Sequence, residues 1–208
     1  ARPDVGKTAF WVSLVASPNG FAWQEKKVSI FANEEPAIRT QMRLLNASTG
    51  LQRGNILNGS RDLAKQKWST ISPYIDNFDC VGKTMDDLDE YCSTNDVDIL
   101  IIDQLDKINV TGKYNATHEK LREVYTQSRE LAKRHNILVI GMSQASAEAQ
   151  GRSRVTFSTM ENSKTGKAAE ADIILGIGKE DEVENYLEDC VRFVTLSKNK
   201  LTGDHAEF

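Results

Sequence analysis

The first eight residues of the chain, Ala1-Arg2-Pro3-Asp4-Val5-Gly6-Lys7-Thr8, decide the fold class. They match the P-loop pattern A/G-x-x-x-x-G-K-S/T, with alanine in the first position. In such a loop, successive backbone N–H groups and the start of the following helix surround the phosphates of a nucleotide. We therefore expect all eight residues to bind a nucleotide. Gly6 lets the backbone approach closely, Lys7 reaches the β- and γ-phosphates, and Thr8 holds Mg²⁺.

A second Gly-Lys-Thr sequence, Gly82-Lys83-Thr84, lacks the rest of the pattern. Asn77 stands five residues before Gly82, where a P-loop has glycine or alanine. Asp87 follows Thr84 by three residues, which is the spacing of a capping box at the start of a helix. This second sequence therefore predicts a helix N-terminus.

The composition indicates one globular domain. The 208 residues are 39% hydrophobic, which is enough for a single buried core. The longest apolar runs, Ile99–Ile102 and Ile137–Met142, are far shorter than the ~20 residues that cross a bilayer. Because no signal peptide opens the chain, we expect a cytoplasmic protein with no membrane partner. The three cysteines form no CxxC pair, which excludes a disulfide framework and a structural zinc site.

The formal net charge of −4 is concentrated in one segment. Residues 179–189 hold one lysine and six acidic residues, so the rest of the chain carries +1. We expect this acidic segment to be a solvated hairpin or turn, which leaves room for a basic surface elsewhere.

Apolar runs alternate with amphipathic stretches along the chain. Continuous apolar strands separated by helices indicate an α/β fold with a mostly parallel sheet that helices cover on both faces. Two strands near the end, with few helices, indicate an antiparallel C-terminal edge. The expected strands are Val28–Ala32, Tyr74–Cys80, Asp98–Ile102, Ile137–Met142, Ile173–Ile177 and Val191–Leu196. The expected helices are Lys7–Ser17, one from Pro36, one from Thr84, and His118–His135.

Three of these strands end in polar side chains. Asn33-Glu34-Glu35 follows the first strand, Asp103-Gln104 the third and Ser143-Gln144 the fourth. Because ligands bind outside the carboxyl ends of parallel strands, we expect these groups on the same edge as the P-loop. ATP hydrolysis needs a carboxylate near Mg²⁺, a base for the attacking water and a polar sensor of the γ-phosphate.

We assign these roles to Asp103, Glu34 and Gln144, in that order, with ATP and Mg²⁺ as cofactors. Glu35 directly precedes Pro36, so it is closer to a helix cap and is the more structural of the two glutamates. Alternatives stay open for the other two carboxylates: Asp103 as the cap of a turn, and Glu34 as a complement to a helix dipole.

In their order and spacing, these residues resemble the ATPase domain of ring-shaped replicative helicases, the DnaB-like family and the related phage helicase–primases. Leu196–Asp204 resembles the family's terminal segment, whose basic residues reach the ATP site of the neighbouring subunit. The other matching segments are Ala1–Phe10 for the P-loop, Phe31–Glu35 for the motif with the catalytic glutamate, Tyr74–Asp76 for a strand, Ile99–Gln104 for Walker B, and Leu138–Gln144 for the sensor strand.

The resemblance implies a RecA-like core over residues 1–208, as a fragment of a longer protein without the strand before the P-loop. It further implies a hexameric ring that moves along single-stranded DNA and unwinds duplex, with primase and other replisome proteins as further partners. Lys200-Leu201-Thr202-Gly203-Asp204 is similar to the phage members, which would place the protein in the cytoplasm of a bacterial host.

The resemblance also assigns two groups of basic residues. Lys198 and Lys200 would complete the neighbouring subunit's catalytic site, with lysine where the family usually has arginine, and lysine lacks arginine's planar two-pronged grip. DNA-facing loops would fall on Asn109–His118 and Ala145–Lys167. The residues that they offer to DNA are Lys113, Arg152, Arg154, Lys164 and Lys167.

Two other classes of protein stay open on the sequence alone. One is a RecA-type recombinase or clock-type ATPase, which shares the fold and does not unwind duplex. The other is a helicase loader or scaffold that binds ATP and hardly hydrolyses it.

Overall fold

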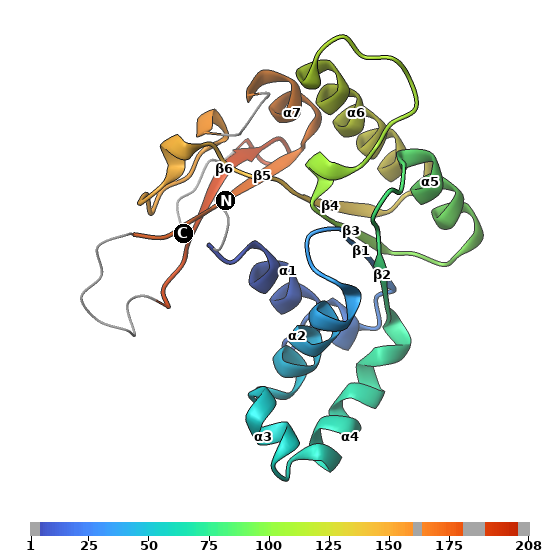
Figure 1. Cartoon of the computed structure of the whole chain (residues 1–208), viewed down its shortest axis with the longest axis vertical. Helices are drawn as coiled ribbons and strands as arrows, with labels where there is room; N and C mark the ends of the chain where they lie inside the picture. Colours follow the sequence, from blue (N-terminus) through green and yellow to red (C-terminus); the bar gives the residue numbers. More distant parts are fainter. Residues whose placement is uncertain (1–4, 160–163, 181–189, 204–208) are drawn as a thin grey trace. The chain divides into compact units, whose positions relative to one another are not determined.

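Four short strands form a parallel sheet in the order β2-β1-β3-β4. The computed structural model describes residues 5–159, 164–180 and 190–203, without the side chains of residues 53, 57 and 164–166. Ala32 pairs with both Asp79 and Asp103, and Asp103 pairs with Met142, so all four strands end level. The strands are β1 (Val28–Ala32), β2 (Ile75–Asp79), β3 (Ile99–Asp103) and β4 (Leu138–Met142) (Figure 1).

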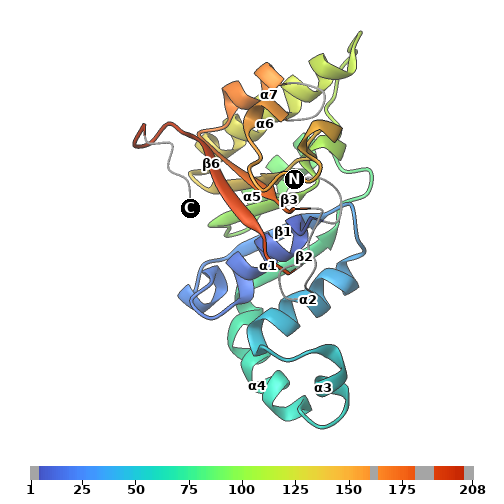
Figure 2. The same ribbon diagram turned by 90° about the vertical axis from the view of Figure 1, so that its left-hand side faces the viewer.

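Helices lie on both faces of this sheet. One face packs against α1 (Lys7–Ala16), α2 (Ala37–Thr49) and the end of α4 (Arg61–Ile71). The opposite face carries α5 (Met85–Thr94) (Figure 2). The Tyr91 ring of α5 lies edge-on to Phe31 of β1 at 5.1 Å. The expectation of a parallel sheet covered on both faces is confirmed.

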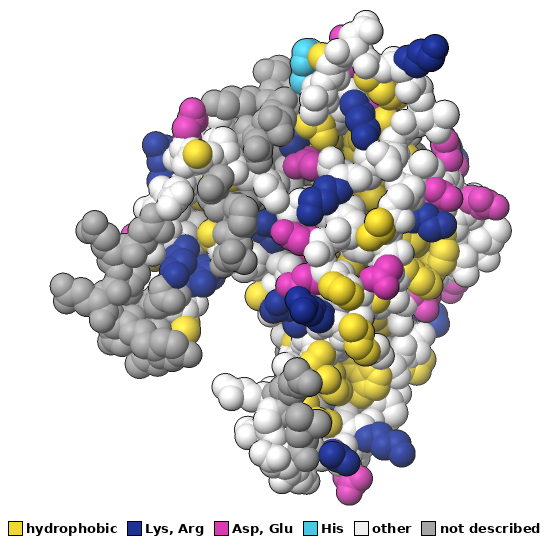
Figure 3. All heavy atoms as spheres, viewed as in Figure 1, with side chains coloured by type: hydrophobic (Ala, Val, Ile, Leu, Met, Phe, Trp, Pro, Cys, Tyr) yellow, Lys and Arg dark blue, Asp and Glu magenta, His cyan; other side chains and the backbone are white. Residues whose placement is uncertain are grey.

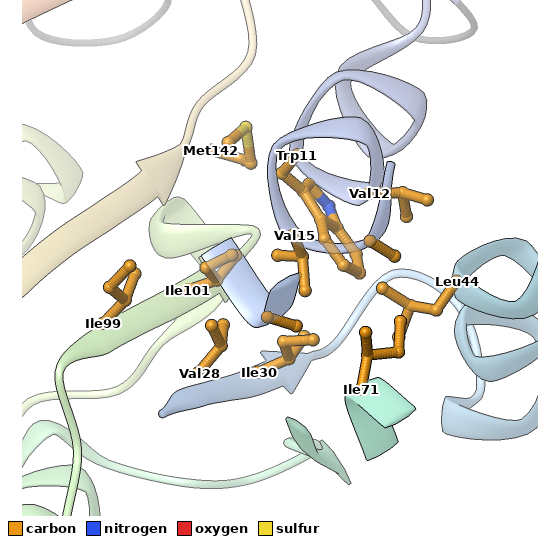
Figure 4. Packing of buried hydrophobic residues seen from close by; sticks show 12 residues of the cluster. Trp11, Val12, Val15, Val28, Ile30, Leu44, Ile71, Ile99, Ile101 and Met142 are labelled. Atoms are coloured by element: carbon orange, nitrogen blue, oxygen red, sulfur yellow. The ribbon is translucent and has the colours of Figure 1, made fainter. Parts of the chain in front are cut away.

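Side-chain alternation along β1 and β3 builds the core. Successive residues of a strand point to opposite faces, so Val28 and Ile30 turn toward α1 while Phe31 turns toward α5. Trp11 of α1 is fully buried against these strands (Figure 4). The cluster on this face is Trp11, Val12, Val15, Ala16, Ala22, Val28, Ile30, Leu44, Ile71, Ile99, Ile101 and Met142.

The chain divides into two compact units. The parallel-sheet unit comprises Thr8–Asn109 and Leu131–Met142, so it contains the sheet and the last turn of α6 (Thr117–His135). The antiparallel unit comprises the described parts of Ala1–Lys7, Val110–Glu130 and Ser143–Phe208. Among the described side chains in Figure 3, basic and acidic residues are interspersed.

The antiparallel unit is built around β5 (Ile173–Gly178) and β6 (Phe193–Asn199). These strands pair antiparallel, as expected, and within the described residues they form a two-stranded sheet of their own. A Cβ at Gly176 would lie 1.7 Å from the Val155 carbonyl oxygen, so only glycine lets this backbone approach β5 so closely. The segment Ala145–Lys167, expected to be a DNA-facing loop, is therefore packed against β5 at Val155. The unit also holds α7 (Lys164–Glu170).

Two details differ from the sequence-based expectations, and a third expectation is not tested. In β4, expected to be buried, only Met142 is buried, because β4 lies at an edge of the sheet. Three described α-helices, α3 (Arg53–Leu57), α4 and α7, had no counterpart, since their segments carry no long apolar run. Most of the acidic segment, residues 181–189, lies outside the described residues.

The helix from Thr84 is confirmed with its capping box. The Asp87 backbone N–H donates to Thr84 Oγ1 (3.2 Å), and the Thr84 backbone N–H donates to Asp87 Oδ2 (2.7 Å).

Across the described helices, none is both long and apolar enough to cross a membrane.

Replacing Thr84 by alanine should lower the free energy of unfolding by about 1 kcal/mol, because a cap of α5 is lost. The hydrogen bonds from the Thr84 backbone N–H and side chain, helped by nearby Lys83, hold the pKa of Asp87 below 3.8. A depressed folded-state pKa contributes stability above the unfolded-state pKa, and this is lost as the pH falls through the folded-state pKa. Urea unfolding of T84A and T84S at neutral and acid pH checks both points. T84S should behave as wild type, and a T84A deficit that grows in acid would contradict the assignment.

The three thiols should react at two very different rates. Burial raises the pKa of Cys80 and of Cys92 to about 11, whereas Cys190 is exposed. Only the thiolate is nucleophilic, so one thiol should react rapidly with a disulfide reagent at pH 8 and two should react slowly. Three equal rates in the folded protein would be inconsistent with this burial.

Candidate functional site

Asp103 is the buried carboxylate at the end of β3, and only 2% of it is exposed. Trp11 Nε1–H donates to Asp103 Oδ2 at 2.7 Å, and Thr8 Oγ1–H donates to the same oxygen at 3.1 Å. Thr8 and Trp11 stand three residues apart on α1, so one helix face delivers both donors. These hydrogen bonds tie the start of α1 to the end of β3.

Glu34 lies just beyond β1 and is exposed. Gln104 Nε2–H donates to Glu34 Oε2 at 2.6 Å, so the carboxylate is held beside the end of β3. Asn33 supports this arrangement: its Oδ1 accepts from the Gln104 backbone N–H (2.5 Å), and its Nδ2 donates to the Gln104 carbonyl (2.9 Å). The peptide bond between Asp103 and Gln104 is cis.

Glu35 is occupied elsewhere. Arg43 of α2 grips it with two hydrogen bonds, Nε to Oε2 at 3.0 Å and Nη2 to Oε1 at 2.7 Å. This two-pronged ion pair fits the structural role expected for Glu35 and leaves Glu34 as the glutamate that contacts Gln104.

The P-loop is described from Val5 onward, because Ala1, Arg2, Pro3 and Asp4 lie outside the described residues. Gly6 has φ of 106°, a conformation that favours glycine. Lys7 begins α1 and is only 5% exposed. Arg192, which directly precedes β6, donates from Nε to the Val5 carbonyl at 2.8 Å. The backbone that precedes α1 is therefore in direct contact with the residue that precedes β6, within the antiparallel unit.

Lys198 and Lys200 of the same unit meet at the end of α7. Lys198 Nζ donates to the Ala168 carbonyl, and Lys200 Nζ donates to the Ala169 carbonyl at 2.9 Å. Asp172 lies 3.8 Å from Lys200 Nζ. Desolvation, followed by the charge of Lys200, lowers the pKa of Lys198. Both lysines thus cap a helix C-terminus in the described chain, where cations are favoured.

Gln144 lies two residues beyond β4, in the antiparallel unit, and is half-buried. Its neighbour Ser143 accepts a hydrogen bond from Lys167 Nζ at 3.3 Å.

The residues expected to contact DNA occupy different environments. Lys113, Arg152 and Arg154 are exposed, as a DNA contact requires. Lys167 was expected on an exposed loop, but it lies in α7, is fully buried and has its Nζ 5.5 Å from the centre of the Tyr125 ring. No side chain of Lys164 is described.

The oxygens of Thr8 and Asp103 suit a hard cation. Mg²⁺ prefers oxygen ligands and is usually held by one or two carboxylates together with substrate phosphates, without an all-protein cage. Thr8 Oγ1 and Asp103 Oδ2 lie 3.1 Å apart, and the described residues contain no cluster of three or more acidic, histidine or cysteine side chains that would form such a cage. The donor set therefore fits Mg²⁺.

Three residues of the site had no role in the sequence-based assignment. The i, i+3 spacing of Thr8 and Trp11 on an apolar helix was a usable signal for Trp11. Gln104 was noted only as the polar end of a strand. Arg192 had no local signal, because it lies 187 positions from its partner Val5.

Comparison with known proteins identifies the family of the chain. The profile of the DnaB-like helicase C-terminal domain family matches residues 1–202. The chain belongs to this family. It is 25% identical to the replicative DNA helicase DnaB of Pasteurella multocida (strain Pm70) and 26% identical to that of Buchnera aphidicola subsp. Acyrthosiphon pisum (strain APS). Each alignment covers 91% of this chain and 43% of the relative, so this DnaB-like domain spans less than half the length of these relatives.

Solved structures agree on the fold. A DnaB-like replicative helicase, described with its interactions with primase, superposes with a TM-score of 0.77 at 20% identity, covering 99% of this chain and 52% of that chain. A second solved structure, itself an ATPase domain, superposes with a TM-score of 0.75 at 19% identity, covering 99% of this chain and 76% of that chain. The α/β fold is thus that of DnaB-like ATPase domains, which confirms the RecA-like core.

A double-mutant cycle should show that Trp11 and Asp103 are coupled in this DnaB-like domain. A hydrogen bond to a charged group contributes about 1.5–3 kcal/mol, so W11F and D103N should be non-additive by about that amount in urea unfolding. Trp23 donates to the Ala16 carbonyl at 2.9 Å and shares no partner with Asp103, so W23F with D103N serves as the control pair. Additive effects in both pairs would mean that the Trp11 contact contributes nothing.

Proposed function

We propose that this chain is the ATP-hydrolysing motor domain of a replicative DNA helicase. One observation carries the proposal: Thr8 and Glu34 both make hydrogen bonds to the end of β3, Thr8 to Asp103 and Glu34 to Gln104. The hydroxyl of Thr8 and the carboxylate of Asp103, which we propose as Mg²⁺ ligands, therefore lie at the same end of β3 as Glu34. Glu34 is exposed, and the side-chain amide of Gln104 holds its carboxylate in place. Phosphoryl transfer to water requires these groups.

The residues divide the work as follows. Ala1 through Thr8 cradle the phosphates, through the backbone N–H groups of every residue except Pro3, and Lys7 supplies a positive charge. Thr8 and Asp103 would hold Mg²⁺, which when bound neutralises charge that develops on the phosphates. Glu34 accepts a proton from the attacking water, and Gln104 orients the Glu34 carboxylate. Gln144 senses the γ-phosphate.

The wider assembly follows from the family. DnaB-like helicases work as rings, so we propose a hexamer in which Lys198 and Lys200 of one copy complete the ATP site of the next. In that ring the two lysines must exchange their α7 carbonyl partners for phosphate oxygens. Primase is a proposed partner because the structural relative is described with its primase interactions. We propose the cytoplasm as the location. If the similarity of Lys200–Asp204 to the phage members reflects a phage origin, this is the cytoplasm of the bacterial host.

Single-stranded DNA is the proposed track. Lys113, Arg152 and Arg154 are exposed on the antiparallel unit and offer charge to a phosphate backbone. Such contacts follow the backbone and read little sequence. Lys164 and Lys167 remain proposals of the family resemblance, and Lys167 would have to leave its buried position to reach DNA.

Replacing Glu34 by glutamine should abolish turnover and leave ATP binding intact. Loss of a general base costs on the order of 10²–10⁴-fold in rate. Steady-state ATP hydrolysis and equilibrium nucleotide binding by full-length protein, with and without single-stranded DNA, check this. E35Q is the matched control, because Glu35 is paired with Arg43 and should not affect turnover. A wild type that binds ATP and hardly hydrolyses it would favour the loader or scaffold class. DNA-independent turnover would favour the recombinase or clock-type class.

Removing Arg152 and Arg154 together should weaken binding to single-stranded DNA and flatten its salt dependence. Each phosphate contact contributes about 0.7 to the slope of log affinity against log salt, so two lost contacts should reduce the slope by about 1.4. Fluorescence anisotropy with an oligonucleotide across a salt series measures it. K65A, an exposed lysine of the parallel-sheet unit, is the control. An unchanged slope in the double variant would remove these arginines from the track.

A further inference from the structure

Arg192 contacts the P-loop through its side chain although it belongs to none of the motifs of the site. Its Nε–H donates to the Val5 carbonyl at 2.8 Å, and its Nη1 donates to its own neighbour's carbonyl, Val191 O, also at 2.8 Å. Its guanidinium is therefore held on two sides and half-buried. All of these atoms belong to the antiparallel unit.

The contact with Arg192 fixes the orientation of the peptide between Val5 and Gly6. The Val5 carbonyl and the Gly6 N–H belong to the same planar trans peptide, so they point in opposite directions. When Arg192 holds the carbonyl on its own side, the Gly6 N–H must point away from Arg192. Gly6 also has φ of 106°, which belongs to the left-handed backbone region used by anion-binding nests.

The Arg192 guanidinium lies close to Gly6. A Cβ on Gly6 would lie 3.7 Å from Arg192 Nε, in ordinary van der Waals contact. The guanidinium thus packs directly over the peptide that it fixes. Because a P-loop binds phosphate through N–H groups that converge on one point, the orientation of each peptide sets the affinity.

We propose that Arg192 is a positioning residue for the P-loop. Its Nε–H fixes the Val5–Gly6 peptide so that the Gly6 N–H is preoriented toward the phosphates of a bound nucleotide. The inference rests on the proposed function, because it takes the P-loop as the phosphate site. It assigns Arg192 no contact with the nucleotide itself, and it predicts selectivity for ligands that carry phosphates.

Two substitutions separate the hydrogen bond from the charge. Glutamine places its Nε2 donor at the same number of bonds from the backbone as the arginine Nε, but carries no charge. Methionine has similar length and offers no donor there. R192Q should therefore bind ATP and ADP within about threefold of wild type, whereas R192M should lose about tenfold for both, which is the low end for a lost hydrogen bond to a charged group. Adenosine binding should be the same in all three proteins.

The measurements are equilibrium binding of fluorescent ATP and ADP analogues by the full chain, with adenosine as competitor, and the KM and kcat of hydrolysis. R192M should raise KM and leave kcat within about twofold, because the contact is made equally in ground and transition states. Spectra of ¹⁵N-glycine-labelled protein give a readout without turnover: the Gly6 amide should shift on ADP addition in wild type and R192Q, and shift less in R192M. R39M, an exposed arginine of α2, is the control.

The outcomes are distinguishable. If wild type binds no ATP, the proposed function fails and the inference fails with it. If wild type binds ATP and R192M binds as tightly, the inference alone is overturned. Equal losses in R192Q and R192M would also overturn it, because the charge and not the Nε–H would then be responsible. Thermal unfolding of both variants is measured alongside, and R192Q carries the test if R192M does not fold, since R192Q must then retain both tight ADP binding and the Gly6 shift.

Discussion

The hydrogen bond from the Trp11 indole N–H to the Asp103 carboxylate fixes α1 against β3, and the parallel-sheet unit depends on this constraint. A buried carboxylate is tolerated only with hydrogen-bond donors, and α1 supplies two of them from one face, an indole N–H and a hydroxyl. The same indole ring fills the core between α1, β1 and β3 (Figure 4). The Trp11 side chain therefore contributes both to the core and to the hydrogen bonding of Asp103. α1 cannot move away from β3 without exposing the core and removing a donor from a buried carboxylate.

Hydrogen bonds also connect the end of β3 to the residues that follow the neighbouring strand β1. Asn33 and Gln104 exchange hydrogen bonds between side chain and backbone, and Gln104 then reaches Glu34. Thr8, Asp103 and Glu34 are thus connected to one another through β3 by short polar contacts. Side chains held in place in this way need little further ordering, which is the condition that the proposed hydrolysis of ATP sets for its catalytic groups.

Sequence patterns predicted most of the parallel-sheet unit, because a buried parallel strand has an unmistakable apolar run and a P-loop has a fixed spacing. β1 was predicted to the residue, and Glu34 and Asp103 were proposed as site residues from their position after strands. β4 was harder, since exposure at a sheet edge depends on strand order, which no local pattern encodes. Arg192 shows the same limit for the site: its partner is fixed by tertiary structure alone. Lys167 shows the same limit for a charged side chain. A lysine in a loop-like stretch was interpreted as solvated, but Lys167 is buried, where it contacts Ser143 and the Tyr125 ring.

Three consecutive residues of α7 link two parts of the antiparallel unit. Lys167 engages Ser143, next to Gln144, while the carbonyls of Ala168 and Ala169 engage Lys198 and Lys200. Neighbouring residues of one helix turn together, so a rotation of α7 that frees either lysine also pulls on the segment that follows β4. Neighbouring positions of a single helical turn therefore hold both the two lysines and the segment that follows β4.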